Sequence, residues 1–444
     1  MTSDPAALAD PLRAPALVVR PAGPVGGTVH APASKSVTNR LLVIAALADG
    51  VSTLRGPLDS DDSRAMRDCL TALGAAIDVD GPTWRVSGTA GRPATPAAPL
   101  QARLSGTTAR FVTAVLPLAA GPAELTGRGP LRRRPIGPLV DALRALGADL
   151  AATDDGLPVR AVGGGIAGGP VAVDVRRSSQ FASAVLLVAP YARRDVTCTL
   201  RGRSAADYIA LTVDEMAAWG AEVTTVTGGW RVSAGAGYRA RDVDVEHDAS
   251  AAAHLYALAA ASGGRVTVAN AVGATRQPDA GATAVFAALG CTVDDGGPGI
   301  TVTGPRALQP IDVSLGAMPD QVTTFGALAA LAPGTSVLRV VGVARTHETD
   351  RLAALAAELG RLGVDVDAGA DTLTVHGGTA RGPARLRTYD DHRLAMAFAA
   401  LGTRLSGVAI DDPGCVAKTY PAFWGDLRDL GGRWDIPQGS GEGT

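Results

Sequence analysis

Apolar stretches with helical periodicity recur along the chain at a nearly constant spacing. Each stretch is opened by a polar cluster, and the stretches begin near Ser36, Thr107, Ser179, Ser250, Gln321 and His392, 71 or 72 residues apart. Apolar-Gly pairs, which commonly close helices with a left-handed residue, form a second series at Gly74, Gly147, Gly220, Gly290, Gly363 and Gly431. The two series together predict six similar modules in the 444 residues.

Short alternating segments follow most of these glycines. Residues 75–80 and 364–367 alternate in polarity, and after a turn each is followed by a second such segment, at 84–86 and 373–375. Alternation of this kind predicts paired strands. The pattern therefore predicts the order strand, helix, strand, helix, strand, strand in each module. Its length of about 70 residues exceeds that of thin solenoid repeats, so we expect α/β modules grouped into compact domains.

The two helices of a module differ in polarity. Residues 41–48 are all apolar, which predicts a helix buried on every side, whereas residues 138–146 are amphipathic and should face solvent on one side. The buried helices begin with Ser, Thr or Asp. Their unpaired N–H groups and positive dipole ends would converge and favour an anion.

Composition narrows the class of protein. The chain is 46% hydrophobic but only 4% aromatic, so its cores must be built from Ala, Val and Leu. A net charge of −2 gives no general attraction to nucleic acid or to anionic membranes. Four scattered cysteines form neither a zinc motif nor a disulfide framework. With no leader-like or membrane-spanning apolar run, we expect a cytoplasmic protein.

Lysine is almost absent from the chain. Lys35 and Lys418 are its two lysines, so 39 of the 41 basic residues are arginine. A coding bias toward arginine would explain the loss of lysine from most positions, and the two remaining lysines could then persist by chance. Arginine cannot, however, replace lysine where a compact ammonium group must release a proton. We therefore interpret both lysines as functional.

Polar clusters at the helix starts hold most of the unusual residues, at 105–110, 178–180, 320 and 390–393. Each alone could be a helix cap. Outside them, the triple arginine at 132–134 could be a solvated turn and 345–351 an ordinary helix start. Taken together, these segments predict a metal-free site for substrates with several negative groups, with Asp320 and Glu348 to handle protons. No nucleotide, flavin or metal motif is recognisable.

Six of these segments, in order, resemble the 5-enolpyruvylshikimate-3-phosphate synthase family of enolpyruvyl transferases. The resemblance covers residues 17–435, and any one segment alone is weak. The segments are Ser34-Lys35-Ser36-x-Thr38-Asn39-Arg40, Arg134-Pro135-Ile136, Ser178-Ser179-Gln180-Phe181, His347-Glu348-Thr349-Asp350-Arg351-Leu352, Asp391-His392-Arg393-x-Ala395-Met396 and Lys418-Thr419.

The resemblance implies a two-domain inside-out α/β barrel with six pseudo-repeats, three in each domain. One domain would span 34–245, and the other would combine 1–33 with 246–444 and end in a flexible tail from about residue 438. The active site would lie in a cleft that closes on its substrates. Members of the family are usually monomeric, so we expect a monomer. From the missing motifs and the net charge we expect no cofactor, no metal and no nucleic-acid or membrane partner.

Substrate contacts follow from the matched positions. Lys35, Gly106, Arg134, Gln180, Arg351, Arg393 and Lys418 would bind phosphoenolpyruvate. Ser36, Arg40, Ser178, Ser179, Gln180, Tyr208, Asp320 and His347 would bind shikimate 3-phosphate.

The implied reaction belongs to the shikimate pathway, which makes chorismate and the aromatic amino acids. The 5-hydroxyl of shikimate 3-phosphate adds to C2 of the enol while C3 is protonated, and the tetrahedral intermediate loses phosphate. Lys35, Asp320 and Glu348 would be the catalytic residues, with Lys35 steering a proton to the leaving phosphate. Gly106 leaves space in the pocket, which implies sensitivity to glyphosate.

Several positions depart from the family pattern. Many members have Asn where Leu104 and Val343 stand, and Lys where His347 stands. Ser204 is one position off the usual spacing before Tyr208, and Arg177 is an uncommon extra cation.

These departures motivate one alternative, a paralogue that acts on a related cyclitol or cyclohexene acid in a secondary pathway. A UDP-N-acetylglucosamine enolpyruvyl transferase is disfavoured because no cysteine lies in a matching motif. A non-catalytic anion-binding protein is the alternative from another class.

Overall fold

The structure, a computed structural model, describes residues 10–202, 206–272 and 275–437. The contacts divide the chain into two compact units. Unit 1 comprises Met1–Pro32, Ala249–Thr275 and Asp279–Thr444, and unit 2 comprises Ala33–Asp248 and Arg276–Pro278. The expected flexible tail and Ser204 lie outside the described residues.

Unit 2 contains three four-stranded sheets with one topology, in which an edge strand runs parallel to its neighbour and two antiparallel strands follow. The sheets, in spatial order, are β14 (Asp242–Asp244), β3 (Val51–Arg55), β5 (Thr83–Ser87), β4 (Ala76–Asp80); β6 (Leu100–Gln101), β7 (Ala123–Thr126), β9 (Gly156–Ala161), β8 (Leu150–Thr153); and β10 (Gly169–Asp174), β11 (Val196–Arg201), β13 (Gly229–Val232), β12 (Val223–Val226).

Unit 1 repeats the same topology three times. Its sheets are β2 (Gly26–Val29), β15 (Arg265–Val268), β17 (Gly299–Thr303), β16 (Thr292–Gly297); β18 (Asp312–Ser314), β19 (Gly334–Arg339), β21 (Thr372–Gly377), β20 (Asp365–Ala368); and β22 (Ala384–Leu386), β23 (Val408–Asp411), β1 (Ala16–Arg20), β24 (Arg433–Asp435).

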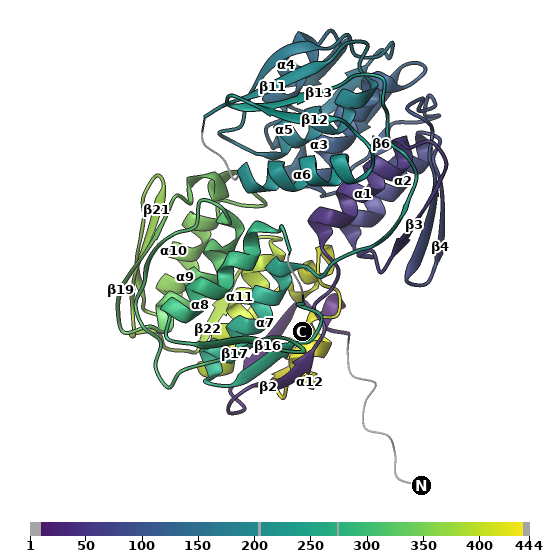
Figure 1. Cartoon of the computed structure of the whole chain (residues 1–444). Helices are drawn as coiled ribbons and strands as arrows, with labels where there is room; N and C mark the ends of the chain where they lie inside the picture. The colour runs from purple at the N-terminus through teal and green to yellow at the C-terminus, as the bar shows by residue number, and fades with distance from the viewer. Residues whose placement is uncertain (1–9, 203–205, 273–274, 438–444) are drawn as a thin grey trace, which may run out of the picture. The chain divides into compact units, whose positions relative to one another are not determined.

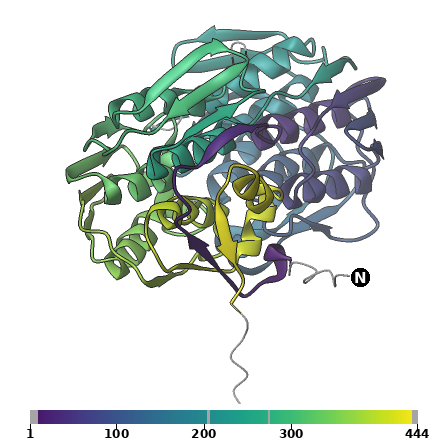
Figure 2. The same ribbon diagram turned by 90° about the horizontal axis from the view of Figure 1, so that it is seen from below.

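Three sheets are completed by strands from distant parts of the chain. β14 pairs in parallel with β3, and β2 pairs in parallel with β15. β1 lies between β23 and β24, antiparallel to both, so that the N-terminal strand closes a C-terminal sheet (Figure 2). Three of the six modules are therefore completed by a strand from a distant part of the chain, and the other three are built from continuous stretches.

The first helix of each module forms the core of its unit. These helices are α1 (Lys35–Leu47), α3 (Gly106–Val115) and α5 (Gln180–Val188) in unit 2, and α7 (Ala249–Ser262), α9 (Val322–Leu331) and α11 (His392–Arg404) in unit 1. Every residue of α3 and of α7 is buried. In unit 1, α11 packs against both α7 and α9, while the sheet of β19 and β21 lies on the outside of α9 (Figure 1).

The second helix of each module is partly exposed. These helices are α2 (Asp61–Ala72), α4 (Gly137–Ala145), α6 (Ala206–Ala218), α8 (Ala282–Ala288), α10 (Arg351–Arg361) and α12 (Phe423–Asp429). α4 buries Leu139, Val140, Ala142 and Leu143 and exposes Asp141 and Arg144, as its amphipathic pattern predicts.

The predicted helix boundaries are confirmed. All six inner helices begin within one residue of the predicted positions. The six glycines that were predicted to end the outer helices all have positive φ, from +79° at Gly363 to +99° at Gly74. Helices inside and sheets outside give the two-domain inside-out α/β fold.

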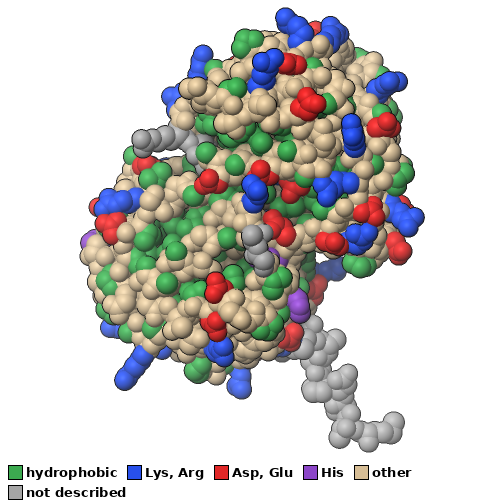
Figure 3. All heavy atoms as spheres, in the orientation of Figure 1, with side chains coloured by type: hydrophobic (Ala, Val, Ile, Leu, Met, Phe, Trp, Pro, Cys, Tyr) green, Lys and Arg blue, Asp and Glu red, His purple; other side chains and the backbone are tan. Residues whose placement is uncertain are grey.

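The surface of each unit carries both signs of charge. On the face drawn in Figure 3, acidic and basic side chains are interspersed over both units. Of the helices in the described part of the chain, none is both long and apolar enough to cross a membrane.

Candidate active site

The starts of three helices in unit 2 form one connected group around Lys35. Ser34 caps α1 by accepting a hydrogen bond from the backbone N–H of Val37. The Lys35 ammonium lies 3.6 Å from the Asp62 carboxylate on α2. The backbone carbonyl of Asp62 accepts a hydrogen bond from Thr108 Oγ1 on α3, at 3.2 Å. Lys35 is therefore held at the point where α1, α2 and α3 begin.

Gly106 lies against two guanidinium groups. A Cβ added to Gly106 would be 2.7 Å from an Arg134 nitrogen and 2.8 Å from an Arg110 nitrogen. Arg110 donates to Gln180 Oε1 at 2.9 Å, and Gln180 Nε2 donates to Thr107 at 3.4 Å. Gly106 thus permits the close approach of two cations to the start of α3, and Gln180 joins α5 to this group.

Arg40 is buried and bound within unit 2. It donates to Thr212 Oγ1 at 2.8 Å and to the backbone carbonyls of Ser36 at 2.8 Å and Tyr208 at 3.0 Å. Burial lowers the pKa of Arg40 to about 10, although the Tyr208 and Glu215 side chains oppose that shift. Arg40 therefore connects the predicted residues Ser36 and Tyr208 by hydrogen bonds to their backbones.

Not every cluster residue faces this group. Ser178 and Ser179 are half-buried at the start of α5, where Ser179 makes no side-chain capping bond and Ser178 Oγ accepts from the Gln180 N–H. Arg177 forms an exposed ion pair with Asp155 at 3.0 Å. Arg132 and Arg133 are exposed, so the solvated-turn interpretation applies to them, while Arg134 approaches Gly106.

Arg351 is the centre of the site residues in unit 1. Its side chain is buried and contacts three carboxylates, with distances of 2.6 Å to Asp320, 2.8 Å to Glu348 and 2.7 Å to Asp391. Burial opposes the charge of Arg351, but these three anions raise the pKa of its guanidinium above the ordinary value. The interpretation of 345–351 as a solvated helix start holds for Asp350, which caps α10, and is wrong for Arg351.

Three further side chains extend this ion-pair network. The Lys418 ammonium donates to Glu348 at 3.0 Å, and an Arg393 nitrogen lies 3.2 Å from Asp320. His347 Nδ1 lies 2.8 Å from the same Asp320 carboxylate. Asp391 also caps α11 by accepting from the Arg393 N–H. The network, called here the unit 1 cluster, consists of Asp320, His347, Glu348, Arg351, Asp391, Arg393 and Lys418.

Asp320 is strongly acidic in this environment. Burial favours the neutral acid, but the charges of Arg393 and Arg351 and the His347 contact together hold the pKa of Asp320 well below its ordinary value. Asp320 is therefore ionised at neutral pH. It can accept a proton, but only weakly while the two arginines remain beside it.

Sequence reasoning missed three residues of these groups. Arg110 and Asp391 lie inside motifs that the sequence analysis identified, but their contacts with Gln180 and Arg351 were not predicted. Asp62 could not be recognised from the sequence, because no local pattern connects it with Lys35. Of the departures, Leu104 is exposed beside the start of α3, and Val343 lies on the short η7 helix (Gly342–Thr346) that precedes His347.

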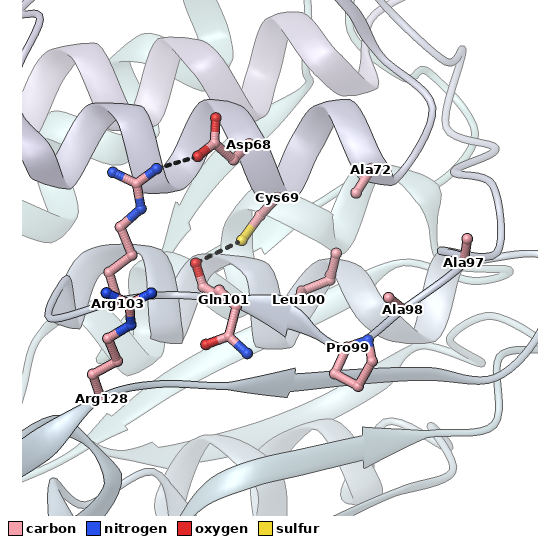
Figure 4. A pocket seen from close by; sticks show the side chains of 10 residues that line it. All are labelled: Asp68, Cys69, Ala72, Ala97, Ala98, Pro99, Leu100, Gln101, Arg103 and Arg128. Carbon is pink, nitrogen blue, oxygen red and sulfur yellow. Dashed lines mark hydrogen bonds and ion pairs between the residues drawn. The ribbon is translucent and has the colours of Figure 1, made fainter.

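A pocket of about 480 Å³ lies elsewhere on unit 2, between α2 and β6 (Figure 4). None of the predicted site residues lines it. Burial raises the pKa of its Cys69 thiol to about 12, so this cysteine is protonated and not nucleophilic at neutral pH.

The family of the chain is shown by comparison with known proteins. A family model described as EPSP synthase (3-phosphoshikimate 1-carboxyvinyltransferase) matches residues 19–427. The chain belongs to the EPSP synthase family. A 3-phosphoshikimate 1-carboxyvinyltransferase from Methanosphaerula palustris is 41% identical over 91% of this chain and 97% of its own length. One from Trichormus variabilis is 39% identical, over 90% and 95%.

Solved structures share the fold. An EPSP synthase from Acinetobacter baumannii superimposes with a TM-score of 0.80 at 24% identity, over 95% of this chain and 99% of that one. An enolpyruvyl transferase, NikO from Streptomyces tendae, gives a TM-score of 0.75 at 18% identity, over 95% and 98%. The predicted EPSP synthase resemblance and fold are confirmed, and the fold is common to more than one enolpyruvyl transferase.

Proposed function

We propose that the protein is a 3-phosphoshikimate 1-carboxyvinyltransferase, which transfers the enolpyruvyl group of phosphoenolpyruvate to the 5-hydroxyl of shikimate 3-phosphate and releases phosphate. The observation that carries the proposal is whole-length similarity to proteins of that name, at 41% identity. The buried cations and carboxylates described above supply chemistry that such a reaction needs.

The unit 2 residues would bind negative groups. Lys35 and Gln180 begin the inner helices α1 and α5, and the guanidinium of Arg134, which precedes α4, lies against Gly106 at the start of α3. The N–H groups and dipoles of these helix starts also favour anions. In this proposal Lys35, Arg134 and Gln180 hold the phosphate and carboxylate of phosphoenolpyruvate. Arg40, Ser178 and Tyr208 would bind the acceptor, shikimate 3-phosphate. These groups stabilise charge that develops on the phosphate as its bond to C2 breaks.

The unit 1 cluster would handle protons. Asp320 removes the proton of the attacking 5-hydroxyl as its oxygen bonds to C2, and C3 of the enol receives a proton. In the second step C3 loses a proton, the double bond re-forms and phosphate departs. Glu348, in contact with Lys418 at 3.0 Å, is the second candidate for the transfers at C3.

Substrate charge would itself activate Asp320. The pKa of Asp320 is low because Arg393 and Arg351 are nearby. A phosphate or carboxylate bound to Arg393 offsets that positive charge, so the pKa of Asp320 rises when the substrate arrives. Asp320 then becomes a stronger base only in the complex.

Free cysteines are consistent with a reducing compartment, since all four are unpaired in the structure. We place the enzyme in the cytoplasm and expect it to act as a monomer.

The test is a direct assay of purified protein with phosphoenolpyruvate and shikimate 3-phosphate. We expect phosphate release together with a product whose mass equals shikimate 3-phosphate plus an enolpyruvyl group. Unphosphorylated shikimate serves as the control acceptor and should react poorly. Phosphoenolpyruvate binding without either product would instead favour another acceptor, or an anion-binding protein without turnover.

A further inference from the structure

A three-residue segment, 277–279, carries buried side chains that reach both groups of site residues. It enters the short η5 helix (Pro278–Gly281). Gln277 belongs to unit 2 and Asp279 belongs to unit 1. The two residues are only 5% and 1% exposed, although both are polar. Neither was among the residues that the sequence singled out.

Gln277 fixes the helix start that carries Lys35. It accepts a hydrogen bond from Ser34 Oγ at 2.9 Å and donates to the backbone carbonyl of His247 at 2.6 Å. Ser34 is the N-cap of α1 and immediately precedes Lys35. The position of the Lys35 backbone is further set by Asp248, whose carboxylate accepts from the Lys35 N–H at 3.0 Å.

Asp279 fixes the turn that carries Asp320. Its Oδ1 accepts hydrogen bonds from Ser250 Oγ at 2.6 Å and from Gln321 Nε2 at 2.7 Å. Gln321 follows Asp320 directly in the η6 turn (Pro319–Gln321). Gln321 Oε1 in turn accepts from Thr324 on α9 at 2.9 Å. Both ends of the Gln321 amide are thus held, which orients the peptide beside Asp320.

The chemistry of this network favours one geometry. Buried amides and carboxylates cost free energy unless their partners are in place, so a satisfied network specifies a single arrangement. Burial raises the pKa of Asp279, while the charge of Arg393 opposes that shift. Arg393 also pairs with Asp320, so Asp279 and Asp320 lie in the field of the same cation.

We propose that the segment Gln277–Asp279 is a positioning element for the proposed reaction, in which Gln277 orients Lys35 and Asp279, through Gln321, orients Asp320. The inference rests on the proposed function. It adds that one short segment of chain holds Lys35 within unit 2 and Asp320 within unit 1.

The experiment compares Gln277→Met and Gln321→Met with Ser262→Ala. The two Met variants keep side-chain length and remove the hydrogen bonds. Ser262 is a matched control: it is buried at the other end of α7, where it bonds to Leu258 and Val25 and to no site residue. For each variant we would measure kcat, KM for both substrates, the pH profile of kcat and the melting temperature.

The proposal predicts that both Met variants lose about 10- to 100-fold in kcat, with smaller changes in KM. Ser262→Ala should lose stability but keep kcat. Gln321→Met should also move the acidic limb of the kcat profile toward neutral pH, because Asp320 is freed from its arginines, whereas Gln277→Met should not. If Gln321→Met fails to fold, Ser250→Ala removes one donor to Asp279 and should give the same change more weakly.

Two failures are distinguishable. Absence of enolpyruvyl transfer by the wild-type protein would overturn the proposed function. A wild-type protein that is active, with Met variants that lose only as much kcat as Ser262→Ala and keep its pH profile, would overturn the positioning role alone.

Discussion

Arg40 in unit 2 and Arg351 in unit 1 are both buried, but they have different kinds of partner. In unit 2, Arg40 donates to a hydroxyl and two carbonyls. In unit 1, Arg351 contacts three carboxylates. Neutral partners orient an arginine without cancelling its charge, whereas carboxylate partners cancel it.

This contrast indicates that the two kinds of buried cation have different roles. Cations held by neutral groups keep a positive potential that attracts multiply charged anions. Cations balanced by carboxylates form a nearly neutral cluster, in which an incoming anion changes the basicity of the acids. Arg40 would therefore contribute mainly to binding, and the carboxylates of the unit 1 cluster mainly to proton transfer.

The largest expected effect comes from breaking the unit 1 cluster. Arg351→Met leaves Asp320, Glu348 and Asp391 without their central cation, so we expect about 3–5 kcal/mol of destabilisation in urea unfolding. The control, Arg339→Met, breaks an exposed ion pair with Asp312 in the same unit and should cost about 1 kcal/mol or less. Equal losses in the two variants would contradict a special role for the cluster.

Lys35→Arg tests whether unit 2 needs an ammonium and not only a charge. We expect kcat to fall about 100-fold or more while the melting temperature stays near that of the wild type, because guanidinium cannot release a proton. Arg160→Lys, at an exposed pair with Glu124, should leave kcat unchanged. Near-normal turnover by Lys35→Arg would show that lysine persists there by chance.

Gly106→Ala tests whether phosphoenolpyruvate binds against the start of α3 in unit 2. The new methyl would meet Arg134 and Arg110 at under 3 Å and displace their guanidinium groups. We expect KM for phosphoenolpyruvate to rise about 10-fold, and the glyphosate sensitivity expected of the wild type to fall, in steady-state assays.

The control for this substitution is Gly360→Ala on α10, where a Cβ meets no atom within 4 Å. It should stabilise the protein by up to about 1 kcal/mol and leave KM unchanged. An unchanged KM in Gly106→Ala would mean that phosphoenolpyruvate does not lie against Gly106.

The smallest effect concerns pH and the loop before Lys418. Burial and the neighbouring Asp390 raise the pKa of Asp412 from 3.8 to about 6. The folded state therefore binds the proton more tightly, and stability falls as the pH rises from about 4 to about 6. Asp412→Asn should stabilise the protein by about 1 kcal/mol at pH 7–8, after allowance for solvent screening, and have no such effect below pH 4.

Asn also tolerates the left-handed backbone at this position, where φ is +44°. Thermal melts at pH 4 and pH 8 make the comparison. A benefit that is the same at both pH values would rule out the titration of Asp412 as its cause.

Local features of the fold were readable from the sequence. Helix starts and glycine caps follow from residues within a few positions of each other, and both series agree with the structure. The exchanged strands were not readable. β14 pairs with β3, almost 190 residues earlier in the chain, and only tertiary packing selects that partner.

The residues of the candidate site likewise divide into those that the sequence could predict and those that it could not. Lys35, Gly106 and Arg351 could be singled out as candidates because their motifs are local. Asp62, Asp279 and Gln277 could not, since each acts through a partner far away in the chain and resembles an ordinary helix or turn residue. Burial of Arg351 was also unforeseen, because an arginine at a helix start is usually solvated.

An anion bound to the arginines of unit 1 would turn Asp320 into a stronger base. This change in basicity is tested most directly by carbon-13 NMR titration of the aspartate carboxylates, with the Asp320 signal assigned from its absence in Asp320→Asn. In the free protein we expect no protonation of Asp320 down to the lowest pH at which the fold persists, and a clear rise in its pKa when phosphoenolpyruvate is bound. A pKa that stays low or falls on binding would contradict the account.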